Sequence, residues 1–238
     1  FSIDLIPTGA SDPYALRRQS IGLLQIFIDS GFAFSLKELV EKSVSLYMAD
    51  KNKTYIANNQ KRALVVDSIL SFIKTRMVNM LVDRGFSREA VMSASNISFD
   101  DIPDLLLRVE ALDNLRQAPD FEPISSAFKR VVNILKKVRV DALDKSRDDS
   151  KNDNDMSVND NVISVDDNVN SVDHSLFENE AERILYKECR EVSSKVDTLT
   201  QNGDYNSALK EISTLRPHVD KFFDDVMVMV DDELVKRN

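Results

Sequence analysis

The chain has 238 residues, of which 42% are hydrophobic and 30% charged, the composition of a globular protein with one or two domains. Its longest mostly apolar run, residues 21–28, is far shorter than the roughly 20 residues of a membrane-spanning helix, so we expect no membrane contact. The single cysteine excludes an intramolecular disulfide and a multi-cysteine zinc site. No secretion signal opens the chain, so we expect a cytoplasmic protein, and the start at Phe1 without methionine indicates a fragment.

Helix signals follow one another through the first half of the chain. Asp12 and Pro13 are a favourable helix start, and Gly31 is a plausible stop. Ser35 and Glu38 have the spacing of a capping box. Together with the apolar periodicity, these signals predict helices over residues 13–30, 36–49, 59–83, 87–95 and 101–117.

The second half continues in the same way. Apolar periodicity predicts a helix at residues 123–143 and another at 176–201 that ends before Gly203. Asp204 is a favourable cap for a further helix, and a last helix begins at Pro217. The first six residues are the one stretch where a strand could form. We therefore predict an all-α fold, a multi-helix bundle.

A long acidic insertion interrupts this pattern between Ser146 and Ser175. It carries eight aspartates against two basic residues, and a Ser-Val motif recurs in it every seven residues, at Ser157, Ser164 and Ser171. The residues between the valines are mainly Asn, Asp and Ser, which disfavour helix interiors, so we predict a disordered segment. A calcium-binding loop is the alternative, but the segment has no glycine for the sharp turn of such a loop.

Deleting residues 146–175 should therefore leave the thermal midpoint of unfolding almost unchanged. A segment with low hydrophobicity and high net charge buries too little apolar surface to offset the entropy lost on ordering. Thermal unfolding followed by circular dichroism measures the difference. A midpoint lowered by many degrees would show that the repeated valines pack against the rest of the protein.

No group of residues predicts an active site. The two histidines, His174 and His218, are isolated, and no glycine-rich phosphate-binding loop is present. Cys189 lies between charged residues of a helix, where we expect a small buried thiol rather than a nucleophile. The stretch FFDDVMVMVDDE at residues 222–233 has the periodicity of a core segment. We therefore predict no catalytic residue and no metal site.

One helix is unusual in its charge. Residues 125–139, SSAFKRVVNILKKVR, contain five cations and no acid. At 100° per residue, an apolar stripe that includes Phe128 and Leu135 lies opposite a polar face. An ordinary solvated face mixes both signs, so an anionic partner such as RNA is indicated, although a merely solvated cationic helix is the alternative. The polar face consists of Lys129, Arg130, Asn133, Lys136 and Lys137.

Several motifs resemble the β subunit of bacterial heterotetrameric glycyl-tRNA synthetase, in the same order along the chain. They are IPTGASDPYALRR at residues 6–18, Asp104-Leu105 followed by Arg108-Val109-Glu110-Ala111-Leu112, Lys129-Arg130-Val131-Val132-Asn133-Ile134-Leu135, and Phe222-Phe223-Asp224-Asp225-Val226-Met227-Val228-Met229. The sequence departs from this family in two places. An insertion follows Leu143, and the chain ends at Asn238, where members of the family usually continue into a final helical segment.

The resemblance implies the C-terminal part of such a subunit. Residues 1–33 would be the tail of an HD-like domain, 34–118 a helical connecting region, and 119–238 an anticodon-binding helical domain interrupted by the insertion at 146–175. The partners would be tRNA(Gly) and the α subunit in an α2β2 assembly, with ATP and Mg²⁺ used at the α subunit and no cofactor in this fragment.

Two hypotheses of function follow. In the first, the polar face of residues 129–137 binds tRNA phosphates, Asn133 contacts an unpaired anticodon base, and Arg17 and Arg18 add contacts elsewhere. These two arginines could instead pair with acids of a neighbouring domain. In the second, the chain is a non-enzymatic helical scaffold or adaptor whose acidic segment binds basic partners. Only the first predicts RNA affinity that falls steeply with salt.

Overall fold

The computed structural model describes residues 12, 14–48, 59–119, 121–147, 172 and 176–226. Every element of secondary structure among these residues is helical, which confirms the predicted all-α fold. In the described part of the chain, no helix is both long enough and apolar enough to cross a bilayer. The chain forms two compact units, residues 1–113 and 114–238, each with its own packing.

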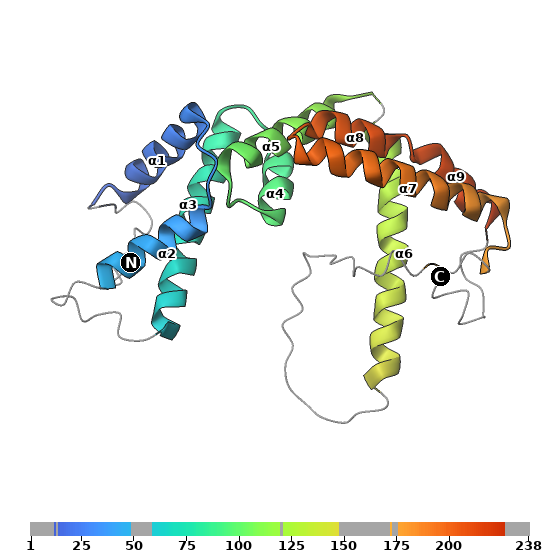
Figure 1. Cartoon of the computed structure of the whole chain (residues 1–238), viewed down its shortest axis with the longest axis horizontal. Coiled ribbons are helices and arrows are strands. Elements are labelled where there is room, and N and C mark those ends of the chain that lie inside the picture. The colour runs from blue at the N-terminus through green and yellow to red at the C-terminus, as the bar shows by residue number, and fades with distance from the viewer. Residues whose placement is uncertain are drawn as a thin grey trace. The chain divides into compact units, whose positions relative to one another are not determined.

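The first unit is built around one long central helix (Figure 1). α1 and α2 both pack against α3, and α4 packs against its C-terminal end. The predicted helices are confirmed to within a few residues, and α5 continues across the border into the second unit. The bounds are Leu16–Ser30 for α1, Leu36–Met48 for α2, Asn59–Asp83 for α3, Arg88–Ile97 for α4 and Ile102–Gln117 for α5.

The start of α1 differs from the prediction. The helix begins at Leu16 and not beside Asp12, because Ala15 adopts a left-handed conformation with φ 55° that interrupts the helical path. Asp12 nevertheless caps the helix from a distance. Its carboxylate accepts hydrogen bonds from the backbone N–H groups of Leu16 at 2.8 Å and Arg17 at 3.2 Å. The expected N-cap residue is therefore wrong, since Ala15 occupies that position, although the Asp12 carboxylate still satisfies two N–H groups of the first turn.

The start of α2 is held by two segments. The hydroxyl of Ser35 accepts a hydrogen bond from the Glu38 N–H at 3.0 Å, as the capping-box spacing predicts. Asp100, which precedes α5, accepts from the Leu36 N–H through its carbonyl at 2.9 Å and from the Lys37 N–H through its carboxylate at 2.7 Å. Three of the free N–H groups of the α2 N-terminus are thus satisfied.

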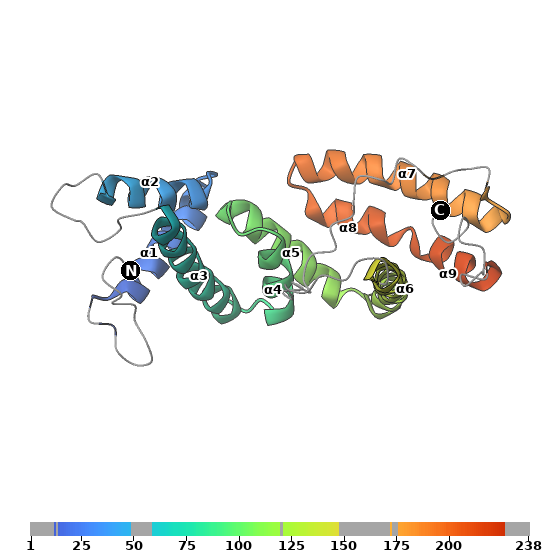
Figure 2. The ribbon, with the colours of Figure 1, turned by 90° about the horizontal axis from the view of Figure 1, so that it is seen from below.

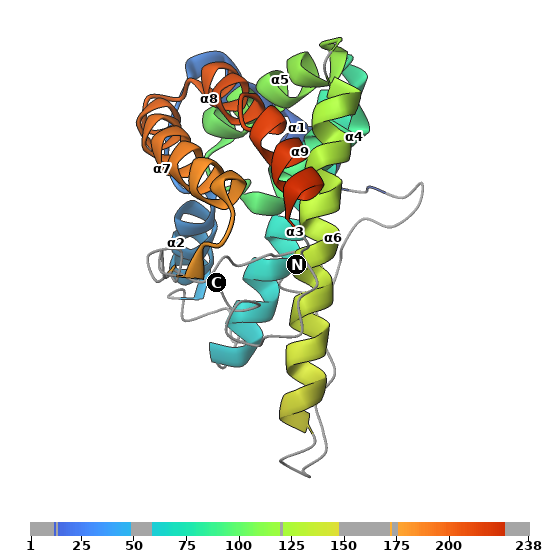
Figure 3. The same cartoon turned by 90° about the vertical axis from the view of Figure 1, so that its right-hand side faces the viewer.

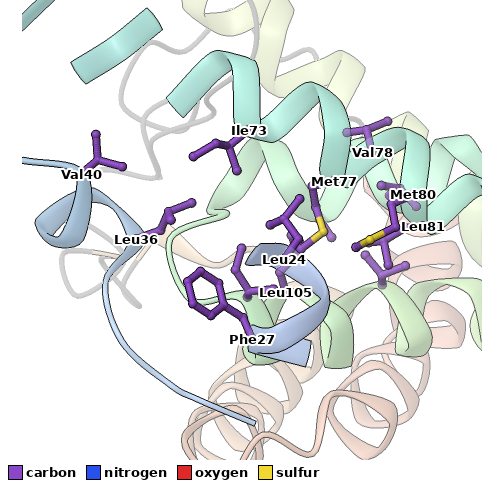
Figure 4. Close-up of a cluster of buried hydrophobic side chains, with 14 of the residues drawn as sticks. Leu24, Phe27, Leu36, Val40, Ile73, Met77, Val78, Met80, Leu81 and Leu105 are labelled. Atoms are coloured by element: carbon purple, nitrogen blue, oxygen red, sulfur yellow. The ribbon is translucent and has the colours of Figure 1, made fainter. Parts of the chain in front are cut away.

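The core of the first unit is a single apolar cluster (Figure 4). Leu24 and Phe27 of α1, Leu36 and Val40 of α2, and Leu105 of α5 converge on the face of α3 that carries Ile73 to Leu81. Leu24, Leu36, Met77, Leu81 and Leu105 are fully buried. The expected boundary at residue 33 falls inside this unit, and the assignment of its parts to an HD-like domain and a connecting region stays a prediction.

The second unit contains α6 (Phe121–Arg147), α7 (Glu180–Gln201), α8 (Tyr205–Ser213) and α9 (Arg216–Asp225). α8 and α9 both pack against α7 (Figure 2), with Ala181, Val192, Ala208 and Val219 buried. α7 begins four residues later than predicted, because Asn179 and Glu182 form a capping box there. α6 reaches Arg147, so the predicted insertion begins inside this helix at Ser146.

Several other predictions fall outside the described residues. They concern the first six residues, residues 148–171 and 173–175 of the acidic insertion, and residues 227–233 of the apolar stretch near the end. The described beginning of that apolar stretch differs from a core segment. α9 ends at Asp225, Val226 is extended, and Phe222 and Phe223 are only half-buried.

Candidate functional site

The basic residues of α6 lie beside a groove in the second unit. Lys129, Asn133 and Lys136 are exposed and succeed one another at intervals of four and three residues, which places them on one side of the helix. The groove has a volume of about 450 Å³. Its lining consists of these three residues and of Leu115, Phe121, Ile124, Ser125, Phe128 and Val132.

The arrangement differs from the sequence prediction in one respect. An apolar stripe opposite the basic face was expected, yet Phe128 and Val132 of that stripe border the same groove as Lys129. The stripe is also incompletely covered, since Leu135 is 49% exposed. The groove therefore combines an apolar floor with a basic rim, which neither feature alone predicts.

The described residues that line the groove include two lysines and no acid. Within the described residues, no carboxylate pairs with Lys129 or Lys136. Two ammonium groups on one helix face repel each other, so an anion bound between them would relieve that repulsion.

Arg130 has a different environment from its neighbour Lys129. Its guanidinium lies over the ring of Phe223 in α9, 4.1 Å from the ring centroid. α9 packs alongside α6 (Figure 3), so this cation–π contact joins the two helices. The structure thus brings Arg130 of the Lys129–Leu135 motif against Phe223, in the described part of the motif that begins at Phe222. The Arg130 side chain leaves α6 about 100° around the helix axis from that of Lys129, so it packs on α9 while Lys129 faces the groove.

The other residues predicted to bind RNA, Lys137, Arg17 and Arg18, do not line the groove as described. The backbone of Lys137 belongs to α6, but its side chain is outside the described residues. Arg17 and Arg18 are the second and third residues of α1, in the first unit. Arg18 is exposed and Arg17 half-buried.

Arg17 lies near a second arginine, Arg76 of α3. Burial and then the Arg17 charge lower the pKa of Arg76, and Asp12 partly offsets them. The Arg76 guanidinium stacks over Phe72 at 3.7 Å from the ring centroid and donates to the Phe72 carbonyl at 3.2 Å. Asp12, Arg17 and Arg76 are therefore electrostatically coupled. All three lie in the first unit, so the alternative in which Arg17 pairs with acids of a neighbouring domain stays a prediction.

A second groove, of about 410 Å³, lies on α7 and was not predicted from the sequence. Phe177 and Tyr186 line it with ring centroids 5.6 Å apart, beside Arg183, Lys187, Arg190 and Glu191. Two of its cations are already paired, Arg183 with Glu180 at 3.8 Å and Lys187 with Glu191 at 3.6 Å. The interleaved basic and aromatic residues of the stretch RILYKECRE were the available signal.

Cys189, on the same helix, is exposed, so the prediction of a buried thiol is wrong. The helix turns this position toward solvent, while the neighbouring Val192 is buried. Partial desolvation and then the Glu188 carboxylate raise the pKa of Cys189. A raised pKa leaves less thiolate at neutral pH and therefore a weaker nucleophile.

Comparison with known proteins identifies relatives along the whole chain. A family model described as glycyl-tRNA synthetase beta subunit matches residues 1–96. The glycine–tRNA ligase beta subunit of Desulforapulum autotrophicum is 52% identical over 238 residues, which are 100% of this chain and 30% of the relative. Those of Desulfatibacillum aliphaticivorans and Geobacter sp. strain M21 are 38% and 37% identical over the same length, covering 30% and 29% of the relatives. The chain thus spans about 30% of the length of these relatives.

Proposed function

The chain belongs with the β subunits of glycyl-tRNA synthetase, to which it is homologous over its whole length, and we propose that it supplies a tRNA-binding surface of that enzyme. The observation that carries the proposal is the groove beside α6, with exposed Lys129 and Lys136 on its rim and no acid among the described residues that line it. Clustered cations favour a polyanion because binding releases counterions from the phosphates.

The name of the relatives, glycine–tRNA ligase beta subunit, supports a wider proposal, whose details come from the resemblance to the family. The chain would act in attaching glycine to tRNA(Gly), in the cytoplasm, as part of an α/β complex of α2β2 composition. ATP and Mg²⁺ would be used at the α subunit. Among the described residues, no group of three or more His, Cys, Asp or Glu side chains could hold a metal ion. We propose that this chain binds tRNA and supplies no catalytic residue.

The test reverses the two rim charges. The double variant Lys129→Glu, Lys136→Glu should bind tRNA more weakly and keep its helicity, because both side chains are exposed and glutamate is a good helix former. If each lysine contacts one phosphate, the slope of log K against log salt should shrink by about 0.7 to 0.9 per contact. Binding titrations at several salt concentrations measure both quantities.

A matched control separates this site from a general effect of net charge. Lys187→Glu with Lys195→Glu changes the net charge equally on α7, where both lysines already have carboxylate partners, Glu191 at 3.6 Å and Glu211 at 3.1 Å. The α6 variant should lose more affinity than this control. Equal losses, or unchanged affinity and slope in the α6 variant, would remove the assignment of Lys129 and Lys136.

A further inference from the structure

We propose that Phe223 of α9 positions the RNA-binding lysines: it holds Arg130 and so sets the direction in which α6 presents Lys129 and Lys136, a role that rests on the proposed function. Arg130 belongs to the basic face of α6, yet its guanidinium lies over the ring of Phe223, 4.1 Å from the ring centroid. Within the described residues, no carboxylate pairs with Arg130. The aromatic ring is therefore the partner that the structure gives this cation.

The section of α6 that carries the two lysines has little core packing of its own. Among the residues of α6 whose side chains are described, Ala127 is the last that is buried, and those from 128 to 136 are half-buried or exposed. α9 is the main described helix that packs against α6 (Figure 3). The direction of this section therefore depends on surface contacts with α9, among them the stack of Arg130 on Phe223.

The stack also fixes the rotation of α6 about its own axis. At 100° per residue, Lys129 projects about 100° and Lys136 about 120° around the axis from Arg130, both on the same side. A contact that holds Arg130 on α9 therefore points both lysines in one common direction, away from α9. Without that contact we expect α6 to tilt and rotate more freely, so that both ammonium groups reach the phosphates together less often.

Phe223 can act in this way because α9 is itself anchored on α7. The two helices pack together, and Val219 of α9 is buried. At the end of α9, the Asp225 carbonyl accepts a hydrogen bond from the side-chain amide of Asn179 at 3.0 Å. The side-chain oxygen of Asn179 caps α7 by accepting from the Ala181 N–H at 3.0 Å. Asn179 thus ties the start of α7 to the end of α9, two residues beyond Phe223.

Direct contact of Arg130 with a phosphate is the alternative, as the basic face of the helix alone suggests. A guanidinium can stack through its face and donate from its edge at the same time, so the geometry of Arg130 fits both roles. The two roles differ in whether they depend on the rim lysines, Lys129 and Lys136. A positioning residue acts through these lysines and contributes nothing once they are gone. A phosphate ligand contributes in either background.

The test uses charge-conserving variants of the 238-residue chain. Phe223→Leu removes the ring, and Arg130→Lys keeps the cation but not its planar stack. Each should lower the affinity for tRNA roughly two- to fivefold, the factor that an exposed cation–π contact can contribute. The double variant should lose no more than either single variant, because both break the same contact. In a Lys129→Gln, Lys136→Gln background, Phe223→Leu should cause no further loss.

Three more variants control the experiment. Phe223→Tyr keeps the aromatic face and should retain the affinity of the unmodified chain. Tyr186→Leu removes a ring from α7 and should not alter the affinity. Circular dichroism and thermal unfolding check that each variant is folded. If Phe223→Leu does not fold, Asn179→Asp makes the same test, since aspartate keeps the cap of α7 and loses the donor to the Asp225 carbonyl. It should lower the affinity only when the rim lysines are present.

Two results would overturn the positioning role of Phe223 and leave the proposed function standing. One is unchanged or raised affinity in the folded Phe223→Leu and Asn179→Asp variants. The other is an equal loss with and without the rim lysines, which would identify Arg130 as a phosphate ligand. If Lys129→Gln with Lys136→Gln loses no affinity, or the unmodified chain does not bind tRNA, the proposed function itself fails.

Discussion

Replacing Arg108 with alanine should destabilise the first unit more than any other single surface-charge change. The Arg108 side chain is 13% exposed and makes three contacts. Its Nε pairs with Asp104 at 2.9 Å, and its two terminal nitrogens donate to the Ala94 and Ser98 carbonyls, each at 2.9 Å. These carbonyls lie at the C-terminal end of α4. The Ala94 carbonyl also accepts the Ser98 N–H at 3.4 Å, so Arg108 adds a second donor there and gives the Ser98 carbonyl a charged donor.

The expected loss in the free energy of unfolding follows from the groups that Arg108→Ala leaves without their donor. Two carbonyls lose a charged donor, and hydrogen bonds to charged groups contribute about 1.5–3 kcal/mol. Asp104 is 37% exposed, so water can solvate its carboxylate once Arg108 is gone. The free-energy cost is therefore smaller than that of an unpaired charge that is fully buried. We therefore expect a loss of about 2–3 kcal/mol in the free energy of unfolding, measured by chemical denaturation.

Two further variants define the cause. Arg108→Lys keeps the charge but lacks the planar fork, so it should recover only a minor part of the loss. Arg88→Ala, at the exposed start of α4, should change the free energy of unfolding by no more than about 0.5 kcal/mol. Full recovery with lysine would show that charge alone matters and would contradict the role of the three directed hydrogen bonds.

This network also explains one of the family motifs in structural terms. Asp104 and Arg108 lie within the sequence that resembles the family, and in the structure both take part in the contact with the end of α4. Leu105 and Val109, on the same helix, are fully buried. The residues of the motif at 104–112 therefore have a structural role, since they pack in the core or bond the end of α4. The basic residues of α6 whose side chains are described, by contrast, are exposed.

Most helix ends could be predicted because their signals are local. Ser87, Asp204 and Gly85 act within a few residues of the end that they define. The contacts that could not be predicted join segments far apart in sequence. Nothing near Leu36 indicates that Asp100 caps α2, and nothing near Arg130 indicates that Phe223 covers it.

The candidate site was predictable only in part, for the same reason. A helical wheel places Lys129, Asn133 and Lys136 together because their spacing is periodic. It cannot show that Leu115 and Phe121 complete a groove beside them, since that depends on how α5 ends and α6 begins. The wheel was also misleading for Arg130, whose position on the polar face does not reveal its contact with α9.

The largest functional effect is expected in the complete α/β enzyme. Forming an aminoacyl-adenylate requires groups that bind ATP phosphates and Mg²⁺ and stabilise the charge that develops during transfer. The resemblance to the family implies that this chemistry belongs to the α subunit, and the proposed role of this chain is to bind tRNA. We therefore expect the 238-residue chain alone to bind tRNA but to show no glycine-dependent ATP–pyrophosphate exchange. Removing it from the β subunit should abolish or strongly impair the charging of tRNA with glycine.

A point variant makes the same distinction without deleting a folded region. In the α/β enzyme, Lys129→Gln with Lys136→Gln should lower kcat/KM for tRNA roughly tenfold, since two exposed ionic contacts contribute about 0.2–1 kcal/mol each. Glycine-dependent exchange should stay unchanged, because that reaction requires no tRNA contact at α6. The control is Lys187→Gln with Lys195→Gln, which should alter neither reaction. Two results would contradict this division of roles: glycine-dependent exchange by the isolated chain, or full charging of tRNA by an enzyme that lacks the chain. If the α6 variant lost exchange and charging in parallel, α6 would act on the site that forms the adenylate and not on tRNA binding.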